Sequence, residues 1–348
     1  MVKIVVVAGG TGGHVFPAVC IAKRLVKEGY NVEFITDVRG NKYLSNTDGF
    51  HVDKQKINHK SKVGLILGII VNFTKNIYKF IKNRPACVIG FGGYPSFAPV
   101  FVAQLMGIKT IIHEQNAVIG RANALLAYRA TRILTAFENT LGILRNGRQY
   151  KRVRCVGNPT RFDDLYENAT RPHNSIFTIL VFGGSQGSAL FADVIAPAIC
   201  KLNKFEVRVF HQARDSDIDR VKGMYINAGI NATVSNFFND IGKLYQASDL
   251  VISRSGASTI FEIVGFKIPS ILIPYARSVN GDQLANARAI KNGAVVIEEK
   301  DVSVENLYLI ILQFIENSSM LTTMSEKLSQ YKLNSNDFMT MIEGVLNH

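Results

Sequence analysis

Two segments of this chain share an order of features that few folds accommodate. In each, a short apolar run leads directly into a glycine-rich stretch, and apolar residues at helical spacing follow. The first segment joins Ile4–Val7 to Gly9–Gly13, and the second joins Phe177–Phe182 to Gly183–Ser188. Short apolar runs rich in β-branched residues are typical of buried parallel strands. The pattern therefore predicts the same unit twice: a strand, a glycine loop and a helix.

Strand and helix alternate in both halves, which predicts an α/β fold with two Rossmann-like, doubly wound parallel sheets. Ligands of such sheets bind beyond the carboxyl ends of the strands, so two such domains are expected to face a cleft. In the first half we expect the helix to begin after Pro17, a loop over 38–62 and a helix over 63–82. The expected divisions are an N-terminal domain at 1–158, a linker at 159–175, a C-terminal domain at 176–325 and a helix within 326–348 that returns to the N-terminal domain.

Charge and composition limit the partners. The chain has 40 Lys and Arg against 27 Asp and Glu, a formal net charge of +13, which suits an anionic partner. Basic and aromatic residues are not interleaved as in RNA-binding modules, so nucleic acid is not expected. The four cysteines stand apart in sequence, which favours reduced thiols over a zinc site. No signal peptide is expected, and no apolar run reaches the roughly 20 residues that span a bilayer.

The glycine loops leave more than one ligand open. A dinucleotide fingerprint beginning at Gly10 would need glycine at position 15, where Val15 stands. Asp37, however, ends the second expected strand, where an acid that binds ribose would lie. No Gly-Lys-Ser/Thr sequence follows either loop, so a P-loop is excluded. The fingerprint is half-matched, and an enzyme acting on a nucleotide sugar fits the two domains better than an oxidoreductase.

Seven motifs occur together and in order: GGTGGHVFPA (9–18), GFGGYPS (90–96), HEQNAVIGRAN (113–123), VGNPTR (156–161), FGGSQGS (182–188), SRSGASTIFE (253–262) and DQLANA (282–287). Over about residues 4–290 the chain resembles the MurG family of bacterial glycosyltransferases. The resemblance implies a GT-B fold. It also implies inverting transfer of N-acetylglucosamine from UDP-GlcNAc to the MurNAc 4-hydroxyl of undecaprenyl-pyrophosphoryl-MurNAc-pentapeptide, without a metal or other cofactor.

That reaction belongs to peptidoglycan synthesis and so to cell-wall biogenesis, cell shape and cell division. The resemblance implies a peripheral protein at the cytoplasmic face of the bacterial inner membrane. Two alternatives stay open: a GT-B transferase with another acceptor, and a non-catalytic protein that binds a nucleotide sugar at the membrane.

The chemistry needs a base that takes a proton from the acceptor hydroxyl. His14 follows the first glycine loop, and a helix N-terminus favours neutral imidazole, which makes His14 the first candidate. Its alternative is a histidine with only a structural hydrogen bond at the start of the helix. Glu114 is the rival base, or the residue that orients it.

The family resemblance assigns the expected substrate contacts. Thr11, Gly12 and Gly13 would serve the acceptor, and Asn116 would contact the donor. In the C-terminal half, Ser185 would donate to the diphosphate at a helix N-terminus, and Glu262 would accept from the ribose hydroxyls. The remaining expected contacts are Arg161 and Arg254 (charge on the leaving group, or for Arg254 only an ion pair), Phe238 (uracil, or equally the core), Ala257, Ser258 and Thr259 (donor), and Gln283 (GlcNAc hydroxyls).

Two further patterns need an interpretation. Asp215 and Asp217 form an acidic pair that could hold a metal, but they are interpreted as a helix start, where acidic residues are favoured. In 62–84, the apolar stretch 63–71 is followed by lysines at 75, 79 and 82. This segment predicts contact with an anionic membrane surface; the alternative is a core helix with a solvated lysine face.

Overall fold

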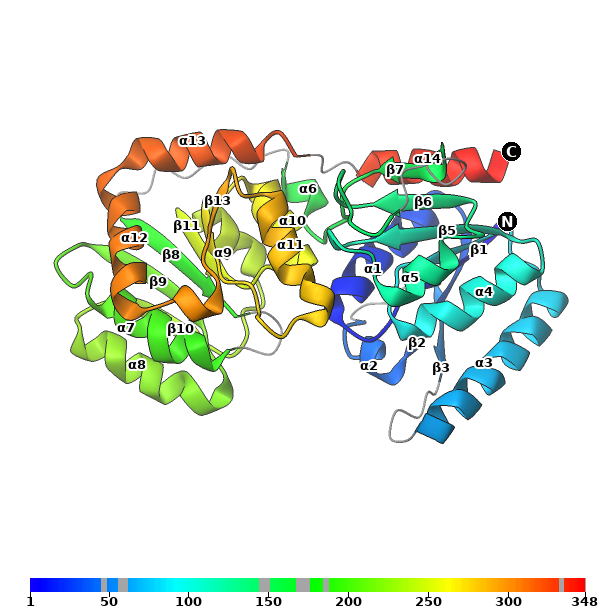
Figure 1. The fold of residues 1–348 in the computed structure, drawn as a ribbon, viewed down its shortest axis with the longest axis horizontal. Helices are drawn as coiled ribbons and strands as arrows, with labels where there is room; N and C mark the ends of the chain where they lie inside the picture. The colour runs from blue at the N-terminus through cyan, green and yellow to red at the C-terminus, as the bar shows by residue number, and fades with distance from the viewer. Residues whose placement is uncertain are drawn as a thin grey trace. The chain divides into compact units, whose positions relative to one another are not determined.

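The computed structural model describes residues 1–44, 49–55, 62–143, 151–166, 176–183, 188–331 and 335–347. The chain divides into two compact units (Figure 1). Unit 1 consists of Met1–Arg161 and Leu333–His348, and unit 2 of Phe162–Lys332. The chain therefore leaves unit 1, forms unit 2, and returns.

Unit 1 contains a seven-stranded sheet in the order β3-β2-β1-β4-β5-β6-β7, with every neighbouring pair parallel. Its strands are β1 (Lys3–Val7), β2 (Asn31–Asp37), β3 (His51–Gln55), β4 (Cys87–Gly90), β5 (Lys109–Glu114), β6 (Arg132–Thr135) and β7 (Val153–Cys155). The predicted loop over 38–62 is wrong at two places, because the short helix α2 (Val38–Asn41) and strand β3 lie within it. Strand β3 is an edge strand without an apolar run, so periodicity gave no signal for it.

Alternate side chains of the central strands face two helical layers. Ile4, Val6 and Phe34 face the layer of α1 (Gly12–Lys27) and α14 (Ser335–Asn347). Val5 and Val7 face the opposite layer. The helices of that layer are α3 (Lys62–Lys82), α4 (Phe97–Leu105) and α5 (Arg121–Leu126). The last helix of the chain is thus part of the core of unit 1 (Figure 1).

Helix α1 begins at Gly12, whereas the sequence predicted a start after Pro17. The carbonyl oxygen of Thr11 accepts from the backbone N–H groups of His14 and Val15, both at 3.2 Å. Proline lacks an N–H and removes one helical hydrogen bond, which is tolerated near the start of a helix. Gly12, Gly13 and His14 therefore form the first turn of the helix and not a loop before it.

Unit 2 contains a six-stranded parallel sheet in the order β10-β9-β8-β11-β12-β13. Its strands are β8 (Phe177–Phe182), β9 (Val207–Gln212), β10 (Asn231–Ser235), β11 (Leu250–Ser253), β12 (Ser270–Leu272) and β13 (Ala294–Val296). Its helices are α6 (Asp163–Tyr166), α7 (Ala196–Cys200), α8 (Ile218–Asn227), α9 (Ile241–Ala247), α10 (Ala257–Phe266), α11 (Asp282–Ala289), α12 (Val304–Glu316) and α13 (Ser318–Leu328). Both sheets confirm the predicted doubly wound α/β class.

Part of the predicted linker at 159–175 packs on unit 2. The rings of Phe162 and Tyr166 lie 5.6 and 5.0 Å from that of Phe266 on α10. Aromatic residues that bury their rings in this way fix the chain, so the segment through α6 belongs to unit 2.

The strand order reverses at one point in each sheet, between β1 and β4 and between β8 and β11. Crevices for ligands form at the carboxyl ends of the strands at such a point. A ligand site is therefore expected in the loops that follow β1, β4, β8 and β11.

Candidate functional site

The imidazole of His14 lies against the glycine turn that follows β4. Gly92 and Gly93 have φ values of +81° and +73°, a region that other residues rarely adopt. A Cβ atom would lie 3.3 Å from Nδ1 of His14 if built on Gly92, and 3.3 Å from its Cδ2 if built on Gly93. Two consecutive glycines thus leave the space that the histidine ring occupies.

Asp37 accepts hydrogen bonds that hold the first glycine loop of unit 1 in place. Its Oδ1 accepts from the N–H groups of Gly10 at 2.9 Å and Gly40 at 2.8 Å, and its Oδ2 accepts from Arg39 Nε at 3.2 Å. The side chain is buried. Both oxygens are engaged by the protein's own groups, so Asp37 shapes the loop and is poorly placed to bind a ribose. This arrangement weighs against the dinucleotide interpretation.

Glu114, at the end of β5, is surrounded by donors. Its Oε1 accepts from the backbone N–H and side-chain amide of Asn116, at 3.0 and 3.3 Å. Its Oε2 accepts from Gly120 N and Asn123 Nδ2, both at 2.9 Å. A buried carboxylate that accepts four hydrogen bonds from the protein's own groups holds its loop in place. The contacts favour Glu114 as an organiser of the 116–123 segment.

Gln115 connects His14 to the interior. Its Oε1 lies 3.0 Å from His14 Nδ1, and its Nε2 lies 2.8 Å from Phe91 O and 3.1 Å from His113 Nδ1. Burial lowers the pKa of His113 to about 4, and its Nε2 lies 3.0 Å from Gly157 O. Sequence reasoning missed Gln115, because nothing local reveals a contact with a residue 101 positions away.

The other expected residues of unit 1 lie near the start of α1 or next to Glu114. Thr11 is the N-cap of α1, and its side chain makes no capping hydrogen bond. Gly12 and Gly13 present the first N–H groups of α1, which helical bonding does not use. The guanidinium of Arg161 lies 5.1 Å from the ring of Phe16, on α1.

In unit 2, Arg254 follows β11 and is almost fully buried. Its Nη1 donates to Ile273 O at 3.1 Å, and its Nη2 donates to Ser188 Oγ at 2.9 Å and pairs with Glu299 at 2.5 Å. These contacts favour the ion-pair alternative: Arg254 joins the segment after β8 to the segment after β12.

The N-termini of α10 and α11 are tied together next to Arg254. Ser255 Oγ donates to Gln283 O at 2.8 Å, and Asn286 Nδ2 donates to Ser255 O at 3.2 Å. Gln283 Oε1 accepts from Tyr275 N at 3.0 Å. Glu262, on α10, is buried and accepts from Tyr245 OH at 3.0 Å. Ala257, Ser258 and Thr259 form the first turn of α10.

The remaining predicted residues are placed as follows. Phe238 is half-buried and meets the ring of Phe210 edge-on, with centroids 6.4 Å apart. Ser185 lies outside the described residues. The structure thus groups His14, Glu114 and their neighbours in unit 1, and Arg254, 257–259, Glu262 and Gln283 in unit 2.

The acidic pair of unit 2 begins a helix, as predicted. Asp217 pairs with Arg214 at 2.6 Å and Arg220 at 3.1 Å, and Asp215 accepts from Asn236 Nδ2 at 2.6 Å. Across the described parts of the chain, no group of three or more His, Cys, Asp or Glu residues is arranged to hold a metal ion.

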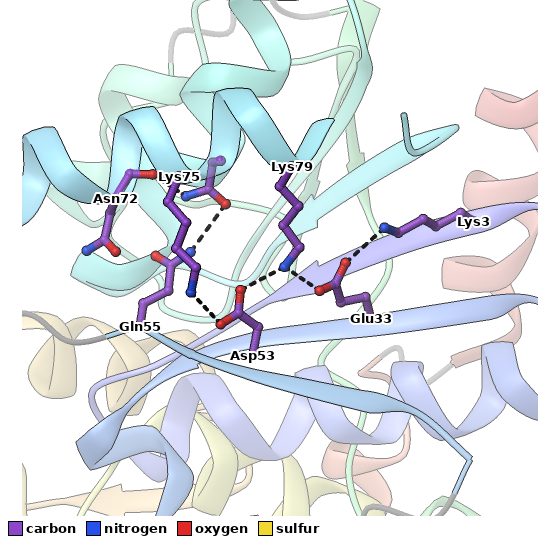
Figure 2. A network of polar contacts seen from close by, with 8 residues as sticks. Lys3, Glu33, Asp53, Gln55, Asn72, Lys75 and Lys79 are labelled. Atoms are coloured by element: carbon purple, nitrogen blue, oxygen red, sulfur yellow. Dashed lines mark hydrogen bonds and ion pairs between the residues drawn. The ribbon is translucent and has the colours of Figure 1, made fainter. Parts of the chain in front are cut away.

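Two lysines of helix α3 pair with acidic residues of the sheet. Figure 2 shows Lys79 reaching Glu33 on β2 and Asp53 on β3, and Lys75 also reaches Asp53. Burial raises the pKa of Asp53, but hydrogen bonds from Lys75 and Lys79 outweigh it, so the net shift is downward. Acidic residues of the neighbouring strands thus pair with both lysines, although Lys75 stays 47% exposed, and membrane contact through 62–84 remains a prediction.

The outer face of α3 also carries several exposed apolar side chains. Its exposed side chains include Tyr78 at 69% and Ile81 at 70% of full exposure. We call this the α3 stripe; its members are Ile70, Val71, Ile77, Tyr78 and Ile81. On the buried side, Gln55 Nε2 donates to Asn76 Oδ1, and Asn76 Nδ2 donates to Asn72 O. The helix thus buries Phe80 and two amides against the rest of unit 1 and leaves the α3 stripe exposed beside Lys75 and Lys82.

No helix in the described parts of the chain is long and apolar enough to cross a bilayer.

Comparison with known proteins places both units. Residues 4–135 match the N-terminal domain, and residues 178–338 the C-terminal domain, of glycosyltransferase family 28. A protein of Allorhizobium ampelinum is 37% identical, with 92% of this chain and 89% of that protein aligned. A protein of Rickettsia felis is 34% identical, with 94% and 95% aligned. Both are named UDP-N-acetylglucosamine–N-acetylmuramyl-(pentapeptide) pyrophosphoryl-undecaprenol N-acetylglucosamine transferase.

Solved structures agree. The crystal structure of MurG from Acinetobacter baumannii superposes with a TM-score of 0.83 at 25% identity and covers 100% of both chains. MnaA from S. aureus, solved with UDP, superposes with a TM-score of 0.69 at 15% identity, which shows a shared fold only.

Proposed function

The chain belongs to the MurG family of GT-B glycosyltransferases, and we propose that its two units divide one reaction between them. The enzyme transfers N-acetylglucosamine from UDP-GlcNAc to undecaprenyl-pyrophosphoryl-MurNAc-pentapeptide, a step of peptidoglycan synthesis. Family membership supports the substrates. The observation that supports the chemistry is the position of His14 at the switch point of unit 1.

In the proposed reaction, the 4-hydroxyl oxygen of MurNAc attacks the anomeric carbon of the donor from the face opposite UDP. The new C–O bond forms as the bond from that carbon to the diphosphate oxygen breaks, which inverts the centre. His14 takes the hydroxyl proton. Glu114 holds the loop beside it through the four hydrogen bonds that its carboxylate accepts.

The first turn of α1 serves the acceptor. The N–H groups of Gly12 and Gly13, with the partial positive charge of the helix start, suit the pyrophosphate of the lipid-linked sugar. Thr11 lies at the same helix start. Asn116 contacts the donor. The N–H of Gly10 already donates to Asp37, so the turn has its shape before any substrate binds.

Unit 2 holds the donor. The N-terminus of α10, with Ala257, Ser258 and Thr259, faces the diphosphate, and Glu262 accepts from the ribose hydroxyls while Tyr245 fixes its carboxylate. Gln283 forms a hydrogen bond with a GlcNAc hydroxyl. Ser185 and Arg161 serve the diphosphate, and Phe238 packs against uracil. Arg254 holds the segments that carry these groups.

The enzyme works as a peripheral protein on the cytoplasmic face of the inner membrane. An apolar stripe on the outside of α3 supports this, because exposed apolar surface of this kind is typical of a docking site. The contact is mainly hydrophobic: acidic partners take up Lys75 and Lys79, and the exposed Lys82 adds charge at the end of the helix.

The test is product formation. Purified enzyme, UDP-GlcNAc and the lipid-linked muramyl pentapeptide should yield the lipid-linked disaccharide, seen by mass spectrometry, while simple polyprenols and flavonoids should not be glycosylated. His14→Ala should lower kcat by about 100- to 10,000-fold, the usual contribution of a general base. UDP affinity should stay unchanged. An equal loss of UDP affinity would contradict the assignment of His14.

A further inference from the structure

We propose that Gln115 is a positioning residue, which holds His14 as the tautomer protonated at Nδ1 and thereby makes Nε2 the atom that accepts the hydroxyl proton. The inference rests on the proposed function, in which His14 is the base. It assigns a role to a residue between two expected site residues, Glu114 and Asn116.

The first step is the orientation of the Gln115 amide. Its Nε2 lies 2.8 Å from the carbonyl oxygen of Phe91 and 3.3 Å from that of His113. Carbonyl oxygens only accept hydrogen bonds, so a nitrogen must occupy this position. The reversed amide would place an oxygen against two oxygens. Two backbone carbonyls therefore fix which end of the amide faces inward.

The second step follows at the other end of the amide. With Nε2 directed inward, Oε1 lies 3.0 Å from Nδ1 of His14. An amide oxygen cannot donate, so Nδ1 of His14 must carry the hydrogen. A neutral imidazole has one N–H, and Nε2 is left with its lone pair.

His113 secures the inner end of this chain. Its Nε2 lies 3.0 Å from Gly157 O, which can only accept, so His113 carries its hydrogen on Nε2. Its Nδ1, 3.1 Å from Gln115 Nε2, is then an acceptor for the second amide hydrogen. Burial lowers the pKa of His113 to about 4, so it stays neutral at working pH. One amide thus links two histidines of opposite tautomer.

The arrangement suits a proton acceptor. When the MurNAc oxygen bonds to the anomeric carbon, its proton passes to Nε2 of His14, and the electrons of the broken bond stay on the UDP oxygen. Nδ1–H keeps its hydrogen bond to Gln115 Oε1 before and after the transfer. No donor or acceptor in the chain has to reorient during the step.

The test replaces the amide by a chain of similar length without an acceptor oxygen. Gln115→Met should lower kcat on the order of 10- to 100-fold, as removal of a partner that orients a histidine does elsewhere. UDP affinity should be unchanged. Gln104→Met is the matched control. Gln104, on α4, also donates to a backbone carbonyl, Leu126 O at 2.8 Å, but this hydrogen bond does not involve His14. The control should keep full kcat.

A spectroscopic readout separates positioning from activity. In ¹⁵N-histidine-labelled protein at a pH where His14 is neutral, His14 should show a protonated Nδ1 and a bare Nε2, and in Gln115→Met the Nε2–H form should gain population. A wild-type His14 protonated at Nε2 would overturn the inference whether or not the variant folds. So would an unchanged tautomer and kcat in folded Gln115→Met. An active His14→Ala enzyme with the expected tautomer spectrum would instead contradict the assignment of the base.

Discussion

Phe338 of α14 stacks on Phe91, with ring centroids 5.5 Å apart and planes 3° from parallel. It also meets the ring of His113 edge-on at 5.2 Å. The last helix of the chain therefore packs directly against the two residues that hold the Gln115 amide. Packing at this position supports both the core of unit 1 and the orientation of His14.

Phe338→Ala should lower the free energy of unfolding by about 3–5 kcal/mol, because it removes a fully buried ring and leaves a cavity. Urea unfolding followed by circular dichroism measures the change. Leu309→Ala on α12 is the control: this side chain is 48% exposed, and the loss should stay within about 1 kcal/mol. Equal stability of the two variants would show that the stacking contributes nothing.

Asp37→Ala should disturb acceptor use without affecting the donor. The change leaves the N–H groups of Gly10 and Gly40 without their acceptor, and the buried one of Gly40 should cost about 1–3 kcal/mol. We expect a higher KM for the lipid-linked acceptor and an unchanged Kd for UDP by calorimetry. Asp37→Asn, whose Oδ1 can still accept, should recover part of the loss. Weaker UDP binding in Asp37→Ala would point to a nucleotide role for this loop.

Tyr78→Asp combined with Ile81→Asp should weaken binding to vesicles that contain phosphatidylglycerol by at least about 10-fold. Burying one large apolar side chain contributes about 1.5–3 kcal/mol, and the variant removes two. Ile226→Asp introduces the same kind of change at an exposed position of unit 2 and should bind like the parent. Sedimentation with vesicles measures both.

Lys75→Gln gives a different expectation, because Lys75 pairs with Asp53. It should change vesicle binding less than twofold. A loss as large as that of the double aspartate variant would favour membrane contact through the lysines of α3.

Acid should destabilise the protein through buried histidine. Burial lowers the pKa of His211 to about 3, below the usual value of 6.5 that it regains on unfolding. Between these values the unfolded state binds the extra proton, so stability falls as pH falls from 6.5 toward 3, by up to about 1.4 kcal/mol per pH unit.

His211→Asn removes this titration, and its amide can still pair with Tyr225 OH, which lies 2.8 Å from His211 Nδ1. Its stability should fall less steeply than that of the parent between pH 6.5 and 4.5, as measured by urea titration at each pH. His113 shifts in the same direction, to about 4, so a residual slope is expected. If the stabilities of the parent and of His211→Asn fell equally steeply with pH, His211 would not be the cause of the pH dependence of stability.

The sequence predicted the two sheets because their buried strands are short apolar runs, such as Ile4–Val7, whose period needs no tertiary information. It failed at β3, because this edge strand, HVDKQ, contains no apolar run. It also failed at the start of α1, because Pro17 and four glycines are local signals against a helix that packing overrides. Motifs identified both His14 and Glu114 as candidate bases. The hydrogen bonds that Glu114 accepts, which only the structure shows, distinguish it from His14.

The position of α14 also affects how the molecule is made. Unit 2 lies between the two segments of unit 1 along the chain, so ribosomes complete 162–332 before they add the helix that covers Phe91 and His113. At about 5–20 residues per second this takes roughly 10–30 s, during which the central sheet of unit 1 lacks part of its cover. Unit 2, which is continuous in sequence, can fold first. The contacts of Phe338 with Phe91 and His113 can therefore form only when synthesis is almost complete.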